Sequence, residues 1–208
     1  MSTFGSDYTR SVSDAAATAP TRRPDAEENR ARIITAAREV FATAGFDAPL
    51  DAIARHAGVG RATLYRNFPD RFALGAAIFE HNLVALEALA REHRGRPDAF
   101  MTLLSAIVEQ QIEGHALVPA LLRGPSVSDL QALALRVMRL VATPLRRARA
   151  AGTVRRDLTP ADVLASLAMI SAVVAGDASV RSRRRRAMRA LDLLIHGLAP
   201  REAPGSSD

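Results

Sequence analysis

The sequence contains no cysteine, no lysine and no tryptophan, and aromatic residues make up only 4% of its 208 positions. Without cysteine there is no disulfide, no thiolate nucleophile and no cysteine-rich zinc site. Hydrophobic residues reach 48%, but no run approaches the ~20 consecutive apolar residues of a membrane helix. The opening stretch MSTFGSDYTRSVSDAAATAP also lacks the basic start and apolar run of a secretory signal. We therefore expect a cytoplasmic globular protein that does not interact with membranes.

The chain also lacks the residue patterns of a metal site or a catalytic centre. Its five histidines show no metal-ligand spacing, and no glycine-rich phosphate-binding loop or Ser-His-acid arrangement can be placed. The sequence therefore predicts a protein that is not an enzyme, with no catalytic residues, no metal and no cofactor.

All of the basic residues are arginine, and they give the chain a net charge of +6. Arginine can bind phosphate and guanine through two parallel hydrogen bonds, so this charge is compatible with a nucleic-acid partner. A GC-rich genome would produce the same arginine and alanine bias. The composition therefore permits DNA binding without showing it.

The chain divides into two helical regions between two tails. Residues 1–24 and 200–208 are rich in small and polar residues without periodicity, and we expect them to be disordered. The N-terminal tail carries Arg10, Arg22 and Arg23, which either enter a DNA minor groove or remain solvated. Helical periodicity then predicts an all-α fold, with a first domain over 25–93 and a second over 97–199.

The segment GVGRATLYRNFP, residues 58–69, predicts the second half of a helix-turn-helix. A helix capped by Asp25 is expected to end at Gly45, and a short helix is expected over 49–57. In the Gly-Val-Gly turn, Gly58 is free to take the left-handed conformation. A third helix over 61–68 would then be anchored by Leu64 and Phe68, four positions apart. Its other side chains would then form an exposed polar face of the width that a major groove accepts.

Residues from about 27 to 87 resemble the DNA-binding domain of the TetR family of bacterial transcriptional regulators. The matching residues are Ile33-Ile34-x-Ala36-Ala37-x-x-x-Phe41-x-x-x-Gly45-Phe46, Ile53-Ala54-x-x-Ala57-Gly58-Val59, Thr63-Leu64-Tyr65-x-x-Phe68 and Pro69-Asp70-Arg71-x-x-Leu74. The resemblance implies a three-helix DNA-binding domain followed by a larger helical domain for ligand binding and dimerisation. It also implies a homodimer on a palindromic operator that is released, as a repressor, by an unknown small-molecule effector.

The resemblance further implies DNA-contacting roles for the third helix. Arg61, Ala62 and Arg66 would reach base edges, Thr63, Tyr65 and Arg71 would hold phosphates, and Asn67 would contact either. Tyr65 packs against the first helix in the alternative interpretation. Pro49 and Gly60 replace hydroxyl residues that are common in the family, so at Gly60 a backbone amide remains for a phosphate.

The second domain offers candidates for an effector pocket but no diagnostic motif. Gln111 and His115 lie on or beside an apolar helical stripe, where a polar group either satisfies a helix end or lines a pocket. Met101 and Met138 are candidates for an adaptable wall. The fourth helix is expected to begin with Asp70 as its N-cap. His81, placed with Leu74 and Ile78 on the inner stripe of this helix, is either a ligand contact or a packing histidine.

The last two predicted helices, about 160–175 and 182–197, carry more apolar residues than one inward face requires. The first of them is expected to begin at Pro160, with Thr159 as its cap and Asp162 completing the turn. Such a surplus calls for a partner, and the resemblance implies that these helices pair with their copies in a second subunit. The predicted dimerisation residues are Leu167, Ile170, Val174, Leu191 and Ile195. The run RSRRRR, residues 181–186, is expected in a loop or a solvated helix start with Asp177 as its counter-charge, and a second nucleic-acid patch is the alternative. A regulator with no small-molecule effector, controlled by a protein partner or by abundance, also fits the sequence.

Overall fold

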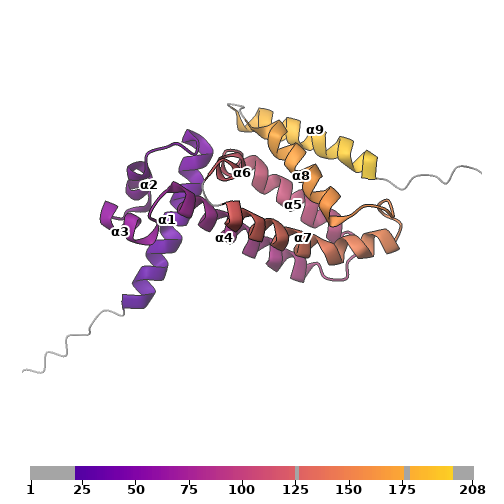
Figure 1. The fold of residues 1–208 in the computed structure, drawn as a ribbon, viewed down its shortest axis with the longest axis horizontal. Coiled ribbons are helices and arrows are strands. Elements are labelled where there is room, and N and C mark those ends of the chain that lie inside the picture. The colour runs from indigo at the N-terminus through magenta and orange to yellow at the C-terminus, as the bar shows by residue number, and fades with distance from the viewer. Residues whose placement is uncertain (1–21, 125–126, 176–178, 199–208) are drawn as a thin grey trace, which may run out of the picture.

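A computed structural model of the chain describes residues 22–124, 127–175 and 179–198. The predicted tails therefore lie outside the described residues, apart from 22–24. Within the described part, every regular element is a helix, which confirms the predicted all-α class (Figure 1). The helices are α1 (Arg22–Ala44), α2 (Leu50–Ala57), α3 (Arg61–Asn67), α4 (Arg71–Glu92), α5 (Ala99–Glu113), α6 (Leu117–Leu122), α7 (Val127–Ala150), α8 (Pro160–Val174) and α9 (Val180–Leu198).

The helices α1 to α3, with the first turns of α4, form a small unit that we call the head. It lies at one end of the molecule in Figure 1, around a core that includes Ile33, Phe41 and Ile53. Helix α1 begins at Arg22, three positions before the predicted cap, so Asp25 lies in its first turn instead of preceding it. The acidic side chain still suits that position, because the positive end of the helix dipole lies there.

Helix α4 leaves the head and continues into the rest of the molecule, which we call the body. Asp70 caps it as predicted, because its Oδ1 accepts a hydrogen bond from the Ala73 amide at 2.8 Å. The helix is long and apolar enough to cross a membrane by length and composition alone. It packs, however, against α1, α5, α6 and α7, as a central helix of a folded protein does.

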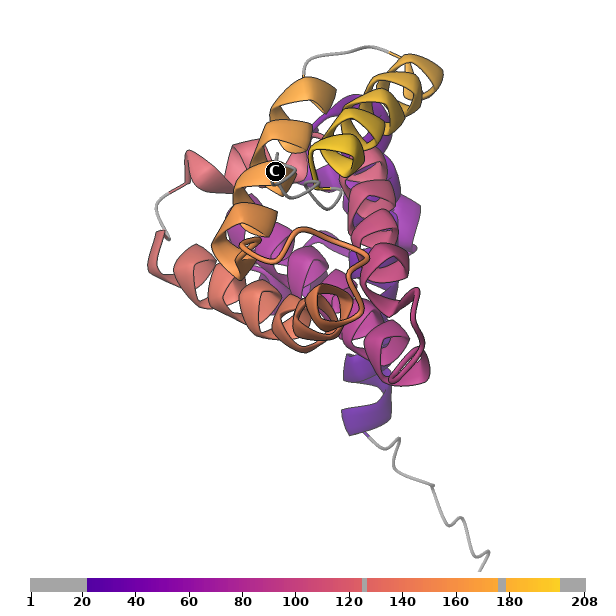
Figure 2. The ribbon, with the colours of Figure 1, turned by 90° about the vertical axis from the view of Figure 1, so that its right-hand side faces the viewer.

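The body is a helical bundle in which α5, α7, α8 and α9 surround one core with the second half of α4 (Figure 2). Arg136 of α7 fixes α4 to this bundle, since it donates to Glu80 at 2.6 Å and to Glu87 at 2.8 Å. These carboxylates, Glu80 first, hold the pKa of Arg136 above its ordinary value. The predicted start of α8 is confirmed, because Thr159 and Asp162 form a reciprocal capping box around Pro160.

Helix α6 connects the cores of the head and the body. Its residues Leu117, Ala120 and Leu121 are buried with the head residues, although the helix follows α5 of the body. Gly75 of α4 permits this contact. A Cβ at Gly75 would lie 3.0 Å from Leu121 Cδ2 and 3.0 Å from Phe46 Cε2. The head therefore packs against both α4 and α6.

Candidate nucleic-acid interface and body cavity

The turn between α2 and α3 is built on Gly58, which has a left-handed backbone with φ +64°. A larger residue would be strained there, and its Cβ would lie 2.7 Å from Arg32 Nη2. Arg32 of α1 donates to the carbonyls of Ala57 at 2.6 Å and Gly58 at 3.1 Å. Its positive charge therefore lies at the C-terminal end of α2, where the free carbonyls and the helix dipole favour a cation.

Helix α3 is attached to the head by the two predicted anchors. The side chains of Leu64 and Phe68 are 0% and 1% exposed. Arg30 of α1 covers Phe68, with its guanidinium carbon 4.4 Å from the ring centroid. This role of Arg30 cannot be predicted from the sequence, because a contact across 38 positions leaves no local pattern.

The remaining side chains of α3 form the exposed surface that the pattern predicts. Arg61, Ala62, Tyr65 and Arg66 are exposed. For Tyr65 the exposed fraction is 44%, so its side chain stays accessible from solvent. The other two side chains are partly buried: Thr63 Oγ1 accepts from Arg66 at 3.0 Å, and Asn67 donates to the Thr63 carbonyl at 2.8 Å.

Two arginines of this surface are held by carboxylates of the head. Arg61 Nε lies 2.9 Å from Asp51 Oδ1 on α2. Arg71, at the start of α4, donates to Asp47 Oδ1 at 3.0 Å and to the Phe46 carbonyl at 3.1 Å. Both ion pairs are accessible to water, so a phosphate or a base can compete for either arginine.

The body contains a cavity of about 640 Å³, which we call the body cavity. It lies between α4, α5, α6, α7 and α8, and aliphatic side chains form most of its wall. Representative apolar wall residues are Phe79, Leu83, Ile107, Leu117, Val137 and Leu164. The polar side chains at its wall are Asn82, Gln110, Gln111 and Ser171. A cavity of this size and character is typical of a site for a small molecule.

Of the predicted pocket residues, Gln111 lines the body cavity. Met101, Met138 and His115 are partly buried but lie outside its lining. His81 is exposed on the far side of α4, so its predicted place on an inner stripe is wrong. The inner face continues from Ile78 to Asn82 and Leu83 instead, and Asn82 is the polar residue of α4 that reaches the cavity.

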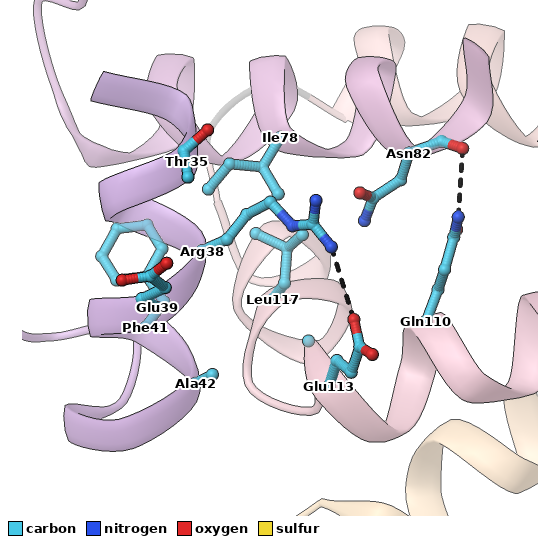
Figure 3. Close-up of a pocket in the computed structure, with 11 residues that line it drawn as sticks. Thr35, Arg38, Glu39, Phe41, Ala42, Ile78, Asn82, Gln110, Glu113 and Leu117 are labelled. Carbon is cyan, nitrogen blue, oxygen red and sulfur yellow. Dashed lines mark hydrogen bonds and ion pairs between the residues drawn. The ribbon is translucent and has the colours of Figure 1, made fainter. Parts of the chain in front are cut away.

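A second, smaller hollow of about 350 Å³ lies where the head meets the body, and we call it the junction pocket (Figure 3). Arg38 of α1 extends across it to Glu113 of α5, with 3.3 Å between Nη2 and Oε2. Gln110 donates to the Asn82 carbonyl at 3.2 Å on the side that faces the body. Asn82, Gln110, Gly114 and Leu117 line both hollows, so the two hollows share part of their walls.

Four of the five predicted dimerisation residues do not lie on the surface of the subunit. Leu167, Ile170, Val174 and Leu191 are at most 4% exposed, so they pack α8 and α9 onto their own body, which corrects the prediction for these four. Ile195 packs against the same core but keeps part of its side chain exposed. The exposed large apolar residues that the structure describes in these helices are Met169, Val173, Val180, Met188 and Leu193.

The run RSRRRR lies inside α9, in its first turns, and does not form a loop. Arg183 is 3% exposed, and Arg184 pairs with Glu109 of α5 at 2.9 Å. The start of the run therefore attaches α9 to the body. Asp177, the predicted counter-charge, lies outside the described residues.

Comparison with known proteins gives two family matches. The family described as bacterial regulatory proteins of the tetR family matches residues 33–78. The C-terminal domain of SbtR-like transcriptional regulators matches residues 97–200, which include α5 to α9. Among proteins with curated descriptions, none matches the chain.

Solved structures with the same fold include several transcriptional regulators. A TetR transcriptional regulator from Streptomyces coelicolor is 30% identical, with 83% of this chain and 99% of that one covered and a TM-score of 0.58. A TetR transcription regulatory protein from Mycobacterium vanbaalenii is 28% identical, with coverages of 86% and 99% and a TM-score of 0.62. A gamma-butyrolactone receptor described as ArpA-like is 25% identical, with coverages of 84% and 90% and a TM-score of 0.55.

Proposed function

The chain belongs to the TetR family of bacterial transcriptional regulators, which are DNA-binding proteins and not enzymes, and we propose that it represses transcription from a palindromic operator until a small molecule enters the body cavity. The observation that supports this proposal is that one chain contains both a candidate DNA-binding surface and a candidate ligand cavity. An exposed, arginine-bearing recognition helix lies in the head, and an apolar cavity lies in the body. Helices α4 and α6 contribute residues both to the core of the head and to the wall of the body cavity.

Helix α3 is suited to a DNA major groove by its anchors and by its charge. Leu64 and Phe68 fix it to the head, so its exposed side chains are presented on a rigid support. Arg61 and Arg66 can each bind a guanine through two hydrogen bonds, and Ala62 can contact a thymine methyl. Thr63, Tyr65 and Arg71, with the backbone amides beside Gly60, are the proposed phosphate contacts, and Asn67 can contact either a phosphate or a base.

A second copy of the chain would supply the second recognition helix. On a palindromic operator, the two copies of α3 would enter successive major grooves about 34–36 Å apart. Met169 and Val173 on α8 are 54% and 37% exposed, and the exposed alanines 161 and 165 on the same helix permit close approach of a partner helix. We therefore place the dimer interface on this face of α8 and on the exposed apolar residues of α9.

The body cavity supports control by a small molecule over control by abundance alone. Leu117 and Leu121 of α6 line this cavity and are also buried in the head core. A ligand that displaces them changes the support beneath Gly75 and Phe46 of the head. It releases DNA only if it binds more tightly to the conformation with the lower DNA affinity. A solved relative described as a gamma-butyrolactone receptor supports the same type of control.

The test is a mobility-shift measurement with the purified full chain and DNA from upstream of its own gene. We expect sequence-preferring binding that weakens steeply as salt rises, because arginines displace counterions from the phosphates. Arg66→Ala should weaken operator binding by about 1–3 kcal/mol. Arg139→Ala, which removes the same charge from an exposed position on α7, should leave it unchanged. Equal losses in the two variants would contradict the assignment of α3 as the recognition helix.

A further inference from the structure

The body cavity has walls without charge. Among the residues that the structure places at its lining, none is acidic, basic or histidine, and Phe79 supplies the single aromatic ring. A charged group moved from water into such surroundings loses its hydration and gains no counter-charge, which costs several kcal/mol. The lining therefore selects against ions and accepts aliphatic groups.

Two residues of this wall, Gln111 and Asn82, each carry a buried side-chain oxygen without a hydrogen-bond donor. Gln111 donates through Nε2 to the Leu167 carbonyl at 3.1 Å, which fixes the orientation of its amide. Its Oε1 is buried, and no donor in the described part of the chain reaches it. The Oδ1 of Asn82 is also buried, and no donor in the described part of the chain reaches it. A buried acceptor without a donor is costly, so each of these atoms favours a ligand that brings an O–H or N–H group.

The two acceptors lie on facing helices of the same cavity, Asn82 on α4 and Gln111 on α5. Asn82 also lines the junction pocket, near the ion pair between Arg38 and Glu113. A ligand group that donates to Asn82 would therefore bind a residue that lines both hollows. The aliphatic part of the ligand would then fill the space toward α7 and α8.

We propose that the effector is an uncharged, largely aliphatic molecule with at least one hydroxyl or N–H group that donates to Gln111 Oε1, and a second donor, where it has one, binds Asn82 Oδ1. This inference rests on the proposed function, because it names the ligand class of the cavity assigned there. Gln111 and Asn82 are then the residues that select the ligand. The aliphatic wall supplies affinity through burial of apolar surface.

The test compares small probes that differ in one chemical property. Calorimetric titration of the purified full chain at pH 7.4 uses 1-decanol and methyl nonyl ether, isomers whose oxygen does or does not carry a hydrogen, together with decanoate and decylammonium. We expect 1-decanol to bind at least about tenfold more tightly than the ether, because only the alcohol satisfies the buried acceptor. Both ions should bind more weakly still.

Variants then locate the effect. Gln111→Met removes the acceptor at similar volume and should reduce the ratio between alcohol and ether to below about threefold. Gln131→Met, on the exposed side of α7, should retain the full ratio. The proposal is overturned if alcohol and ether bind equally, if either ion binds more tightly than the alcohol, if 1-decanol does not bind, or if Gln111→Met keeps the ratio.

The same probes separate this inference from the proposed function. Ligand binding is measured without DNA, and operator release is measured separately by mobility shift. Binding of 1-decanol with the expected ratio but no effect on the operator complex supports the ligand class and contradicts control by the cavity. Release of the operator by decanoate or decylammonium supports control by the cavity and overturns the ligand class.

Discussion

Asp51 of α2 holds Arg61, the first residue of the recognition helix, through an ion pair with 2.9 Å between Oδ1 and Nε. The pair is accessible, with 36% of the Asp51 side chain and 69% of the Arg61 side chain exposed. In the proposed complex with DNA, Arg61 exchanges this carboxylate for a base or a phosphate. On that proposal, Asp51 competes with DNA for the guanidinium of Arg61.

Replacement of this carboxylate is expected to strengthen DNA binding. Asp51→Asn should increase operator affinity about two- to fivefold at low salt, the range that an exposed ion pair contributes. Fluorescence anisotropy with operator and random DNA measures the change. Asp47→Asn is the matched control, because it removes an equal charge beside Arg71. Equal gains for both variants on both DNAs would show an effect of charge alone and no competition for Arg61.

Arg61 and Arg71 should differ in what they contribute to DNA binding. Arg61→Ala is expected to cost about 1–3 kcal/mol on the operator and to relax the preference for one base pair. Arg71→Ala should weaken binding to operator and random DNA alike and lower the slope of affinity against salt by about one. Competition assays at several salt concentrations measure both effects. Equal loss on operator and random DNA for Arg61→Ala would refute this division of roles.

Gly60, before the first turn of α3, is a position where a side chain is tolerated. Its backbone is extended, with φ −71° and ψ 151°, and a Cβ there meets no atom within 4 Å. In Gly60→Ser the hydroxyl can cap α3 and contact a phosphate, so we expect a gain of a few tenths of a kcal/mol in stability and tighter binding to any DNA. Gly60→Ala is the control without a hydroxyl. If alanine tightens DNA binding as much as serine does, the hydroxyl is not responsible.

Acidification should destabilise the body through His115. Burial, and then the positive charge of Arg183, hold the pKa of His115 below its ordinary value of 6.5. The folded state therefore favours neutral imidazole, and the unfolded state takes up the proton more readily. The associated stability is fully present above pH 6.5 and is lost as the pH falls from there through the lower folded-state pKa.

Thermal unfolding at a fixed protein concentration tests this effect. The wild type should lose more of its Tm between pH 7.5 and 5 than His115→Gln loses. His81→Gln, which changes an exposed histidine on α4, should behave as the wild type. A His115→Gln variant with an unchanged pH dependence would remove His115 as the cause.

The sequence was sufficient to predict features that depend on near neighbours in the chain. The left-handed Gly58, the Asp70 cap and the Thr159 capping box each involve residues within five positions of one another. The anchors Leu64 and Phe68 follow from a helix that is too short for more than one buried face. Near neighbours in the chain decide these turns, caps and anchors, and the structure confirms each of them.

Two predictions were wrong because periodicity alone does not decide which side of a helix is buried. After Ile78, steps of three and four positions lead to His81 and Asn82, and tertiary packing selects Asn82. Helix α8 is apolar on nearly all sides, so its sequence does not distinguish the face that packs on its own body from an interface. The structure buries Ile170 and leaves Met169 exposed.

The corrected surface of α8 leads to a prediction about assembly. Met169 lies on an exposed apolar face with Val173 one turn away, so Met169→Glu would place a carboxylate at the proposed dimer interface. A charge that is buried there without a partner costs several kcal/mol, and we expect sedimentation equilibrium to show mainly monomer where the wild type is dimeric. Val84→Glu is the control, because Val84 is 49% exposed on α4, away from α8 and α9. If Met169→Glu remains as dimeric as the control, the subunits associate through a different surface.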